Sequence, residues 1–215
     1  MKLDLNSLIF ENQFFIVINK PVGYEFHGPL GVLNVLRQHF PQLYGVHRLD
    51  KATSGLMVFA KDKNTQKILS EIFSKRKVKK IYLALSSNRP IKKQGKICGD
   101  IVKSRSGNYK LTRQRRNPSL TQFVSCYNDD TSLRCFALRP LTGRTHQLRV
   151  VMSSLAAPIL GDDRYGGEPA QRLYLHAYQL SFEFSNELFD FRYFPDENEY
   201  YHQTKNDFLT ILKKL

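Results

Sequence analysis

Segments typical of β-strands dominate this chain, and their order limits the folds that it can adopt. The run at 14–19 is rich in β-branched and aromatic residues and ends at a Lys-Pro-Val-Gly turn, as a buried strand does. The runs at 121–127 and 133–138 are expected to pair as a hairpin. Other strands are expected at 56–61, 81–85, 97–102, 173–184 and 188–194, and helices at 32–40, 64–76, 146–156 and 206–215.

Because strands outnumber helices and do not alternate regularly with them, the pattern favours an α+β fold over a doubly wound parallel sheet. We expect a mixed, mostly antiparallel sheet flanked by helices and basic loops. A chain of 215 residues can form one large domain or two small ones. No repeat or linker is evident, so a single domain spanning 1–215 is expected.

The charge of the chain points to a polyanionic partner. Lysine and arginine total 33 against 19 acidic residues, which gives a net charge of +14. Nucleic acid is the first candidate, an anionic membrane surface is the second, and an inert basic surface is the plain alternative. Basic residues cluster at 75–80 and at 92–116, and the part from Lys103 to Arg116 is expected to be a mobile loop in contact with the partner.

Several classes of protein are disfavoured. Three irregularly spaced cysteines fit neither a disulfide framework nor a zinc site and indicate a reducing compartment. No signal peptide is evident, and no apolar run approaches the roughly 20 residues of a membrane helix, so a cytoplasmic protein without membrane contact is expected. No phosphate-binding glycine loop or serine-nucleophile motif is present, and the six histidines lack metal-ligand spacing, so no metal is expected.

One carboxylate occupies an unusual position. Asp50 lies two residues after Arg48 and just ahead of a Thr-Ser-Gly turn that leads into an apolar strand. Aspartate is depleted in strands and is costly to bury unless it is paired. Because catalytic groups tend to sit on loops held by a rigid scaffold, Asp50 is a candidate catalytic residue.

Two further segments contain candidate functional residues. Tyr82 lies inside a strand, where the ordinary interpretation is a ring packed in the core. Gly143 permits a tight turn, and Arg144 is expected to open a helix. An arginine at that end is disfavoured by the helix dipole, which mildly supports a functional role over an ordinary surface position.

Together these segments resemble the RluA-type family of RNA pseudouridine synthases. The resemblance runs in the family's order from about residue 15 to 195, most of the chain. It implies a catalytic domain of that family, without a separate N-terminal RNA-binding domain. The matching segments are His47-Arg48-Leu49-Asp50 followed by Thr53-Ser54-Gly55-Leu56, Lys80-Ile81-Tyr82-Leu83-Ala84, and Gly143-Arg144-Thr145-His146-Gln147-Leu148-Arg149.

The resemblance implies isomerisation of uridine in ribosomal or transfer RNA, with no external cofactor. Asp50 would attack ribose C1′ or uracil C6, and Arg144 within about 4–6 Å would keep it ionised. Tyr82 would lie against the uracil with its hydroxyl near C5, while Arg48 would fill the space left by the flipped base or contact a phosphate. The other residues expected to bind or support the substrate are Leu148, His47, Thr53 and Lys20.

Other interpretations stay open at this point. A non-catalytic RNA-binding or chaperone protein could keep the same fold, although a pure binder has no need of a buried acid. An unrelated basic hydrolase has no matching motif. The oligomeric state leaves no signal in the sequence, and a monomer is the default expectation.

Overall fold

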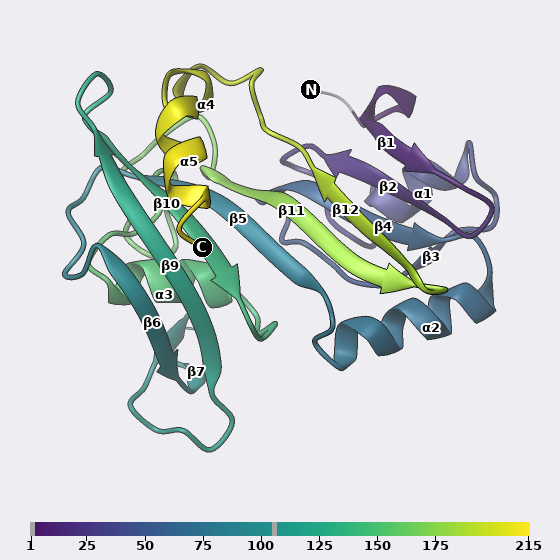
Figure 1. The fold of residues 1–215 in the computed structure, drawn as a ribbon, viewed down its shortest axis with the longest axis horizontal. Coiled ribbons are helices and arrows are strands. Elements are labelled where there is room, and N and C mark those ends of the chain that lie inside the picture. The colour runs from purple at the N-terminus through teal and green to yellow at the C-terminus, as the bar shows by residue number, and fades with distance from the viewer. Residues whose placement is uncertain (1–2, 105–106) are drawn as a thin grey trace. The chain divides into compact units, whose positions relative to one another are not determined.

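Two apolar segments, Phe15–Lys20 and Ser54–Ala60, form strands β2 and β4, in which every residue is buried. The computed structural model describes residues 3–104 and 107–215 (Figure 1). The chain forms two compact units. Unit 1 is Met1–Lys79 with Ala177–Phe194, and unit 2 is Lys80–His176 with Pro195–Leu215.

The sheet of unit 1 forms around β2 and β4, which pair antiparallel with Lys20 opposite Gly55. The strand order is β1 (Leu8–Glu11), β2, β4, β11 (Leu175–Phe184) and β12 (Glu187–Arg192), and β3 (Tyr44–Gly45) also pairs with β4. A core of aromatic and aliphatic side chains, Phe15, Val58 and Phe182 among them, lies on this sheet.

Helix α2 (Lys63–Ser74) adds Leu69 to the core of unit 1. Its N-cap is Asp62, whose carboxylate accepts hydrogen bonds from the backbone N–H of Thr65 at 2.8 Å and from its hydroxyl at 2.6 Å. The helix expected at 64–76 therefore begins one residue earlier, at Lys63, and Asn64 lies inside it and not at its N-cap. Unit 1 also contains the short helix α1 (Val32–Arg37) and the single turn η1 (Leu5–Ser7).

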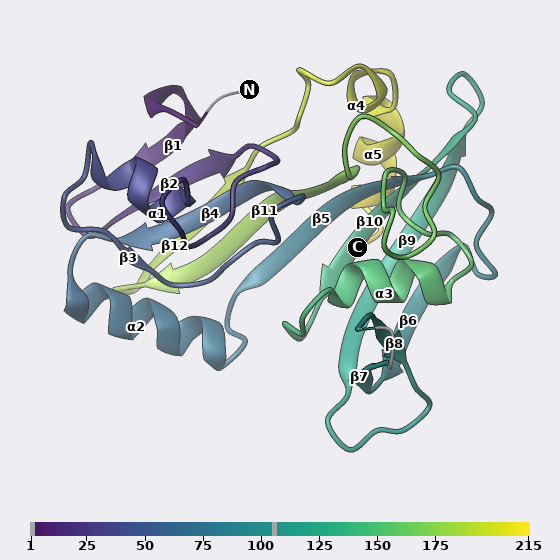
Figure 2. The same cartoon turned by 180° about the vertical axis from the view of Figure 1, so that it is seen from behind.

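Unit 2 has its own antiparallel strands, in the order β5 (Lys79–Ser86), β10 (Leu133–Pro140), β9 (Ser119–Asn128) and β6 (Gln94–Gly99). Helices α3 (Gln147–Ser154) and α5 (Lys205–Leu212) cover opposite faces of these strands, as Figures 1 and 2 show together. Strands β7 (Ile101–Lys103) and β8 (Tyr109–Leu111) form a separate ribbon, and α4 (Glu199–Gln203) precedes α5.

The α+β class with a mostly antiparallel sheet is confirmed, and so is the predicted hairpin, in which Thr121 faces Pro140 and Asn128 faces Leu133. The stretch expected to be a mobile basic loop contains the β7–β8 ribbon; Arg105, part of that prediction, lies outside the described residues. The three cysteines are free thiols. Along the described ranges, no helix is long and apolar enough to cross a membrane.

Candidate active site

A buried lysine anchors the loop that carries Asp50. Lys20 is the last residue of β2 and is 1% exposed. Its ammonium donates hydrogen bonds to the carbonyl oxygens of Pro21 at 2.8 Å, Tyr24 at 3.2 Å and Lys51 at 3.2 Å. Three acceptors match the three N–H donors of an ammonium, which makes its burial tolerable. Since Lys51 directly follows Asp50, the bond from the Lys20 ammonium to the Lys51 carbonyl fixes the backbone next to Asp50.

Backbone hydrogen bonds close the same loop. The Thr53 N–H donates to the Asp50 carbonyl at 3.0 Å, and the Gly23 N–H donates to the Lys51 carbonyl at 2.9 Å. Thr53 is buried, Asp50 is partly exposed, and Arg48 is exposed. The loop therefore carries a partly exposed acid and an exposed arginine on a backbone that is held on both sides.

The second residue of the strand that follows this loop must be glycine. Gly55 has φ +117°, a conformation that L side chains rarely adopt, and a Cβ there would lie 2.4 Å from the Ala177 carbonyl oxygen. Strand β4 thus approaches strand β11 closely at a point five residues after Asp50.

His47 supports the other end of the loop. Its Nε2 accepts a hydrogen bond from the Val58 N–H at 3.2 Å, and its ring stacks on Phe73 with the centroids 4.5 Å apart. A ring nitrogen that accepts from a backbone N–H is unprotonated. The position of His47 suits a neutral structural group that holds the backbone next to Arg48.

Unit 2 carries the tyrosine motif on β5. Tyr82 lies opposite Leu138 of β10 and is partly exposed. Two residues earlier, burial lowers the pKa of Lys80 from its usual value of 10.5. The Lys80 ammonium lies 3.9 Å from the point where a Cβ on Gly143 would sit, so it borders the arginine motif. Sequence reasoning missed Lys80 because one lysine in a basic run carries no signal of burial.

The arginine motif is an ordered turn ahead of α3. The helix begins at Gln147, and His146 before it has a left-handed backbone with φ 53°. The expectation that Arg144 opens the helix is therefore wrong. The Gln147 side chain holds the turn instead: its Oε1 accepts from the Arg144 N–H at 3.0 Å and the Thr142 hydroxyl at 2.7 Å. Its Nε2 donates to the Leu120 carbonyl at 3.1 Å.

The guanidinium of Arg144 has a neutral partner within its own unit. It donates to the Oδ1 of Asn117. Asn117 is held in turn by Asp100, a buried carboxylate that accepts from the Asn117 N–H at 3.0 Å and the Arg116 N–H at 3.1 Å. Leu148 is buried on α3. Asn117 and Asp100 lie more than 25 residues from the motif, so sequence spacing gave no sign of them.

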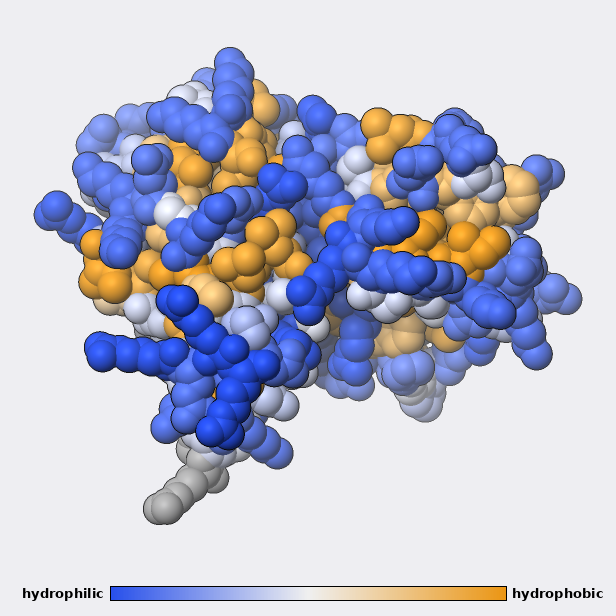
Figure 3. Space-filling model, turned by 60° about the horizontal axis from the view of Figure 1, so that its bottom comes forward, coloured by the Kyte–Doolittle hydropathy of each residue, from blue (hydrophilic) through white to orange (hydrophobic). Residues whose placement is uncertain are grey.

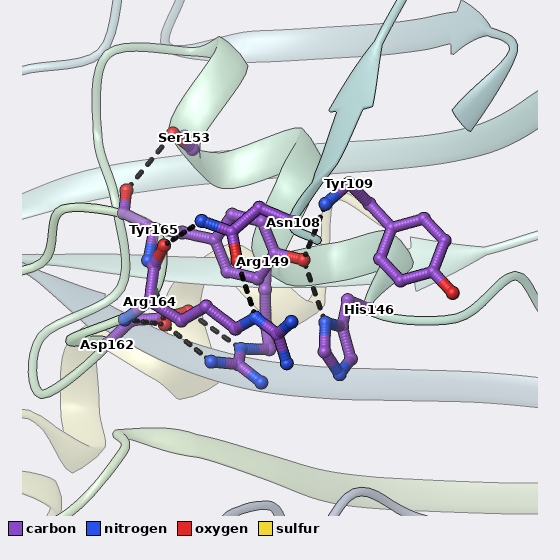
Figure 4. Close-up of polar contacts among 8 residues, drawn as sticks. All are labelled: Asn108, Tyr109, His146, Arg149, Ser153, Asp162, Arg164 and Tyr165. Atoms are coloured by element: carbon purple, nitrogen blue, oxygen red, sulfur yellow. Dashed lines mark hydrogen bonds and ion pairs between the residues drawn. The ribbon is translucent and has the colours of Figure 1, made fainter. Parts of the chain in front are cut away.

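A second set of polar contacts fixes the far side of α3 (Figure 4). Arg149 pairs with Asp162 through two hydrogen bonds of 2.8 and 2.6 Å, and these side chains are only 11% and 0% exposed. The Tyr165 hydroxyl lies 2.7 Å from the Nδ1 of His146. It also accepts from the Tyr109 N–H at 3.3 Å, which ties the β7–β8 ribbon to the arginine motif.

The β7–β8 ribbon is the basic end of unit 2. Arg164 donates to the Asn108 side chain at 2.7 Å and to the Gly107 carbonyl at 3.0 Å, so the described part of the ribbon's turn is anchored. Figure 3 shows hydrophilic residues gathered over this region. Its exposed basic side chains are Lys103, Lys110, Arg113, Arg115 and Arg116.

The candidate residues are divided between the units. Unit 1 holds an anchored carboxylate that can act as a nucleophile or a base, whereas unit 2 holds a tyrosine and a positioned arginine. Within residues 3–104 and 107–215, no three His, Cys, Asp or Glu side chains are grouped as metal ligands would be. The candidate site residues of unit 1 are His47, Arg48, Asp50, Thr53 and Lys20. Those of unit 2 are Tyr82, Arg144 and Leu148.

Comparison with known proteins gives one consistent result. Residues 14–154 match the RNA pseudouridylate synthase family. The chain is 42% identical over 204 residues to an uncharacterized RNA pseudouridine synthase of Haemophilus influenzae, covering 91% of this chain and 90% of that protein. It is 35% identical over 194 residues to the dual-specificity RNA pseudouridine synthase RluA of Vibrio parahaemolyticus, covering 82% and 77%. The solved structure of human RNA pseudouridylate synthase domain containing 4 matches with TM-score 0.78 and 27% identity, covering 94% and 92%.

The chain therefore belongs to the RNA pseudouridylate synthases, isomerases that convert uridine in RNA to pseudouridine. Within that family it is of the RluA type. The family identified from three short motifs is thus confirmed over most of the chain.

Proposed function

We propose that this protein isomerises specific uridines of ribosomal or transfer RNA with Asp50 as its nucleophile. The carboxylate attacks either ribose C1′ or uracil C6, the N1–C1′ bond breaks, and the uracil turns before a C5–C1′ bond forms. The bond between Asp50 and the substrate breaks again, by displacement when C5 attacks C1′ or by elimination from C6, which regenerates the free carboxylate. The proton on C5 then leaves, which restores the uracil ring. The observation that carries the proposal is the anchoring of a partly exposed Asp50: Lys20 and Thr53 hold its loop through hydrogen bonds to the backbone.

The remaining residues take roles that fit their chemistry. Arg144 is the cation that keeps Asp50 ionised, and the neutral amide of Asn117 orients its guanidinium without neutralising it. Tyr82 lies against the uracil and Leu148 forms an apolar wall. Arg48, exposed on the loop, stacks where the flipped base was. His47, Thr53 and Lys20 support the loop.

The setting of the reaction follows from the same features. We propose that the two units act as one catalytic domain, since the motifs of a single reaction are divided between them. The enzyme works as a monomer in the cytoplasm. It needs no metal or external cofactor, because the carboxylate of Asp50 and the guanidinium of Arg144 supply the chemistry. The net charge of +14 attracts the RNA backbone.

Tritium release from RNA labelled at uridine C5 tests the role of Asp50. We expect Asp50→Asn to abolish release, because an amide is not a nucleophile, while its RNA affinity stays close to that of the wild type. Asp129→Asn, an exposed turn residue, is the matched control and keeps wild-type release. Equal release by wild type and Asp50→Asn would exclude Asp50 as the nucleophile.

The role of Arg144 has a separate test. Arg144→Ala should lower turnover far more than RNA affinity, since one phosphate contact among many is a small loss. Single-turnover rates and filter-binding affinities separate the two effects. An affinity collapse with normal turnover would show that Arg144 binds RNA and does not support Asp50. Mapping pseudouridines in cells with and without the gene identifies the RNA and the position.

A further inference from the structure

Unit 2 contains a basic pocket that includes none of the residues assigned to the reaction. Its volume is about 280 Å³, close to the smallest sites that hold small molecules. It lies where the end of β5 meets the β9–β10 hairpin, and no acidic residue lines it. The lining residues are Ser87, Asn88, Arg89, Lys93, Tyr127 and Arg134.

Arg134 is the unusual member of this pocket. It is 8% exposed, and no partner hydrogen-bonds its buried Nε in the part of the chain that the structure describes. Its guanidinium lies 5.6 Å from the ring centroid of Tyr127. None of the ion pairs found among the described residues includes it. Burying a guanidinium without a counter-charge is unfavourable, so the site suits an anion.

The acids of this region do not neutralise Arg134. Asp207 accepts a hydrogen bond of 2.7 Å from the Asn128 side chain and contacts the Cys126 thiol. Asp129 and Asp130 are exposed on the hairpin turn. The pocket therefore keeps its positive charge.

We propose that this pocket binds a phosphate group of the RNA, at a nucleotide other than the uridine that is isomerised. The inference rests on the proposed function in taking RNA as the partner. Arg134 supplies the buried cation, and the exposed Arg89 and Lys93 supply the rim. Tyr127 is 46% exposed, so its ring offers a stacking surface for the adjoining base. Cations beside an exposed aromatic ring are the pattern of single-stranded nucleic-acid sites.

The backbone of the pocket is already in place for such a ligand. The Lys93 carbonyl accepts hydrogen bonds from both the N–H and the hydroxyl of Ser125, each at 2.8 Å. The Asn88 N–H donates to the Ser86 hydroxyl at 3.2 Å. The segment carrying Lys93 is therefore tied to β9, and Asn88 is tied to the end of β5, before any ligand arrives.

The test measures binding of a fluorescent oligoadenylate of about 12 nucleotides, a length within the usual span of single-strand sites. This probe has no uridine, so its binding is independent of isomerisation, and failure of the proposed reaction would not affect the result. The variants are Arg134→Met, which removes the buried charge, and Lys93→Gln, which changes only an exposed side chain. Lys67→Gln, an exposed lysine of α2, is the control.

We expect Arg134→Met to weaken binding about tenfold, the effect of one charged hydrogen bond. The slope of log affinity against log salt should become shallower by about 0.7, as for one lost phosphate contact on a single strand. Lys93→Gln should weaken binding by about twofold to fivefold, and Lys67→Gln should not. Wild-type affinity and slope in both pocket variants would overturn the proposal, and the Lys93 variant decides it if Arg134→Met fails to fold.

Thermal unfolding in inorganic phosphate distinguishes the form of the ligand. If phosphate raises the melting temperature of the wild type but not of Arg134→Met, a phosphate group alone is bound. If phosphate has no effect while the oligoadenylate distinguishes the two proteins, the site needs a nucleotide. An equal rise in both proteins is the general stabilising effect of phosphate, and it would overturn the proposal if the oligoadenylate also binds both proteins equally.

Discussion

The buried ion pair between Arg149 and Asp162 makes a strong quantitative prediction. The Asp162 carboxylate is fully buried and accepts two hydrogen bonds from the Arg149 guanidinium, at 2.6 and 2.8 Å. It also accepts from the backbone N–H groups of Arg164 and Tyr165, each at 3.2 Å. Asp162→Asn removes the charge and turns an NH2 group toward one of these donors. The largely buried Arg149 cation then loses the negative charge of its partner carboxylate.

Breaking such a pair costs about 3–5 kcal/mol, because one charge remains buried without its partner. Equilibrium unfolding in urea should therefore show the midpoint of Asp162→Asn reduced by about 1–2 M for an ordinary denaturant slope. Asp196→Asn is the matched control. Its ion pair with Lys205 has the same 2.6 Å distance, but the two side chains are 45% and 42% exposed. Exposed pairs contribute about 0–1 kcal/mol, so this variant should unfold close to the wild type.

A double variant separates charge burial from loss of packing. Arg149→Met with Asp162→Leu replaces both charges by apolar groups and should recover most of the lost stability. Equal small losses in Asp162→Asn and Asp196→Asn would refute the reasoning, because burial would then make no difference. A double variant as unstable as Asp162→Asn would assign the loss to shape and to the two backbone N–H groups that lose their acceptor, and not to the Arg149 charge.

Three further outcomes are expected. Gly55→Ala should lower the free energy of unfolding by about 2–4 kcal/mol, from backbone strain and a clash with the Ala177 carbonyl oxygen. Gly23→Ala, also at positive φ but with open space around it, should lower it by about 1 kcal/mol in the same urea assay. Burial lowers the pKa of Lys80, so the unfolded chain binds that proton more tightly than the folded protein does. The free energy of unfolding therefore rises with pH between the lowered pKa and 10.5. Lys80→Met should abolish this rise and be more stable than the wild type at pH 7. Tyr165→Phe should lose about 1 kcal/mol with its bond to His146, and calorimetry that shows no loss would contradict this.

Much of the fold could be predicted because local signals and burial agree. The β2 segment has no polar residue until Asn19, and the structure buries it completely. The hairpin of β9 and β10 follows from two alternating runs around a polar turn. Helix ends were less certain, since Asp62 and Asn64 are both good caps and only tertiary context decides between them. Strand β1 was missed because it is short and its residues are only partly buried.

The candidate site was predicted in part. Three motifs located Asp50, Tyr82 and Arg144 because each combines an unusual residue with a turn or a strand. The residues that hold them gave no such signal. Asn117 contacts Arg144 across 27 positions of sequence, and Asp162 contacts Arg149 across 13. Such partners depend on how distant loops meet, which residue spacing does not encode.

The division of the chain has a consequence for its synthesis. Unit 1 is completed only by residues 177–194, after the main part of unit 2 has been made. Until then, β4 lacks its neighbour β11, and that edge of a fully buried strand is paired only at Phe59 and Ala60, by β3. Open edges of apolar strands favour aggregation. A nascent chain stalled between Lys80 and His176 would therefore be a better chaperone substrate than the finished protein, even though the loop that carries Asp50 has already been made.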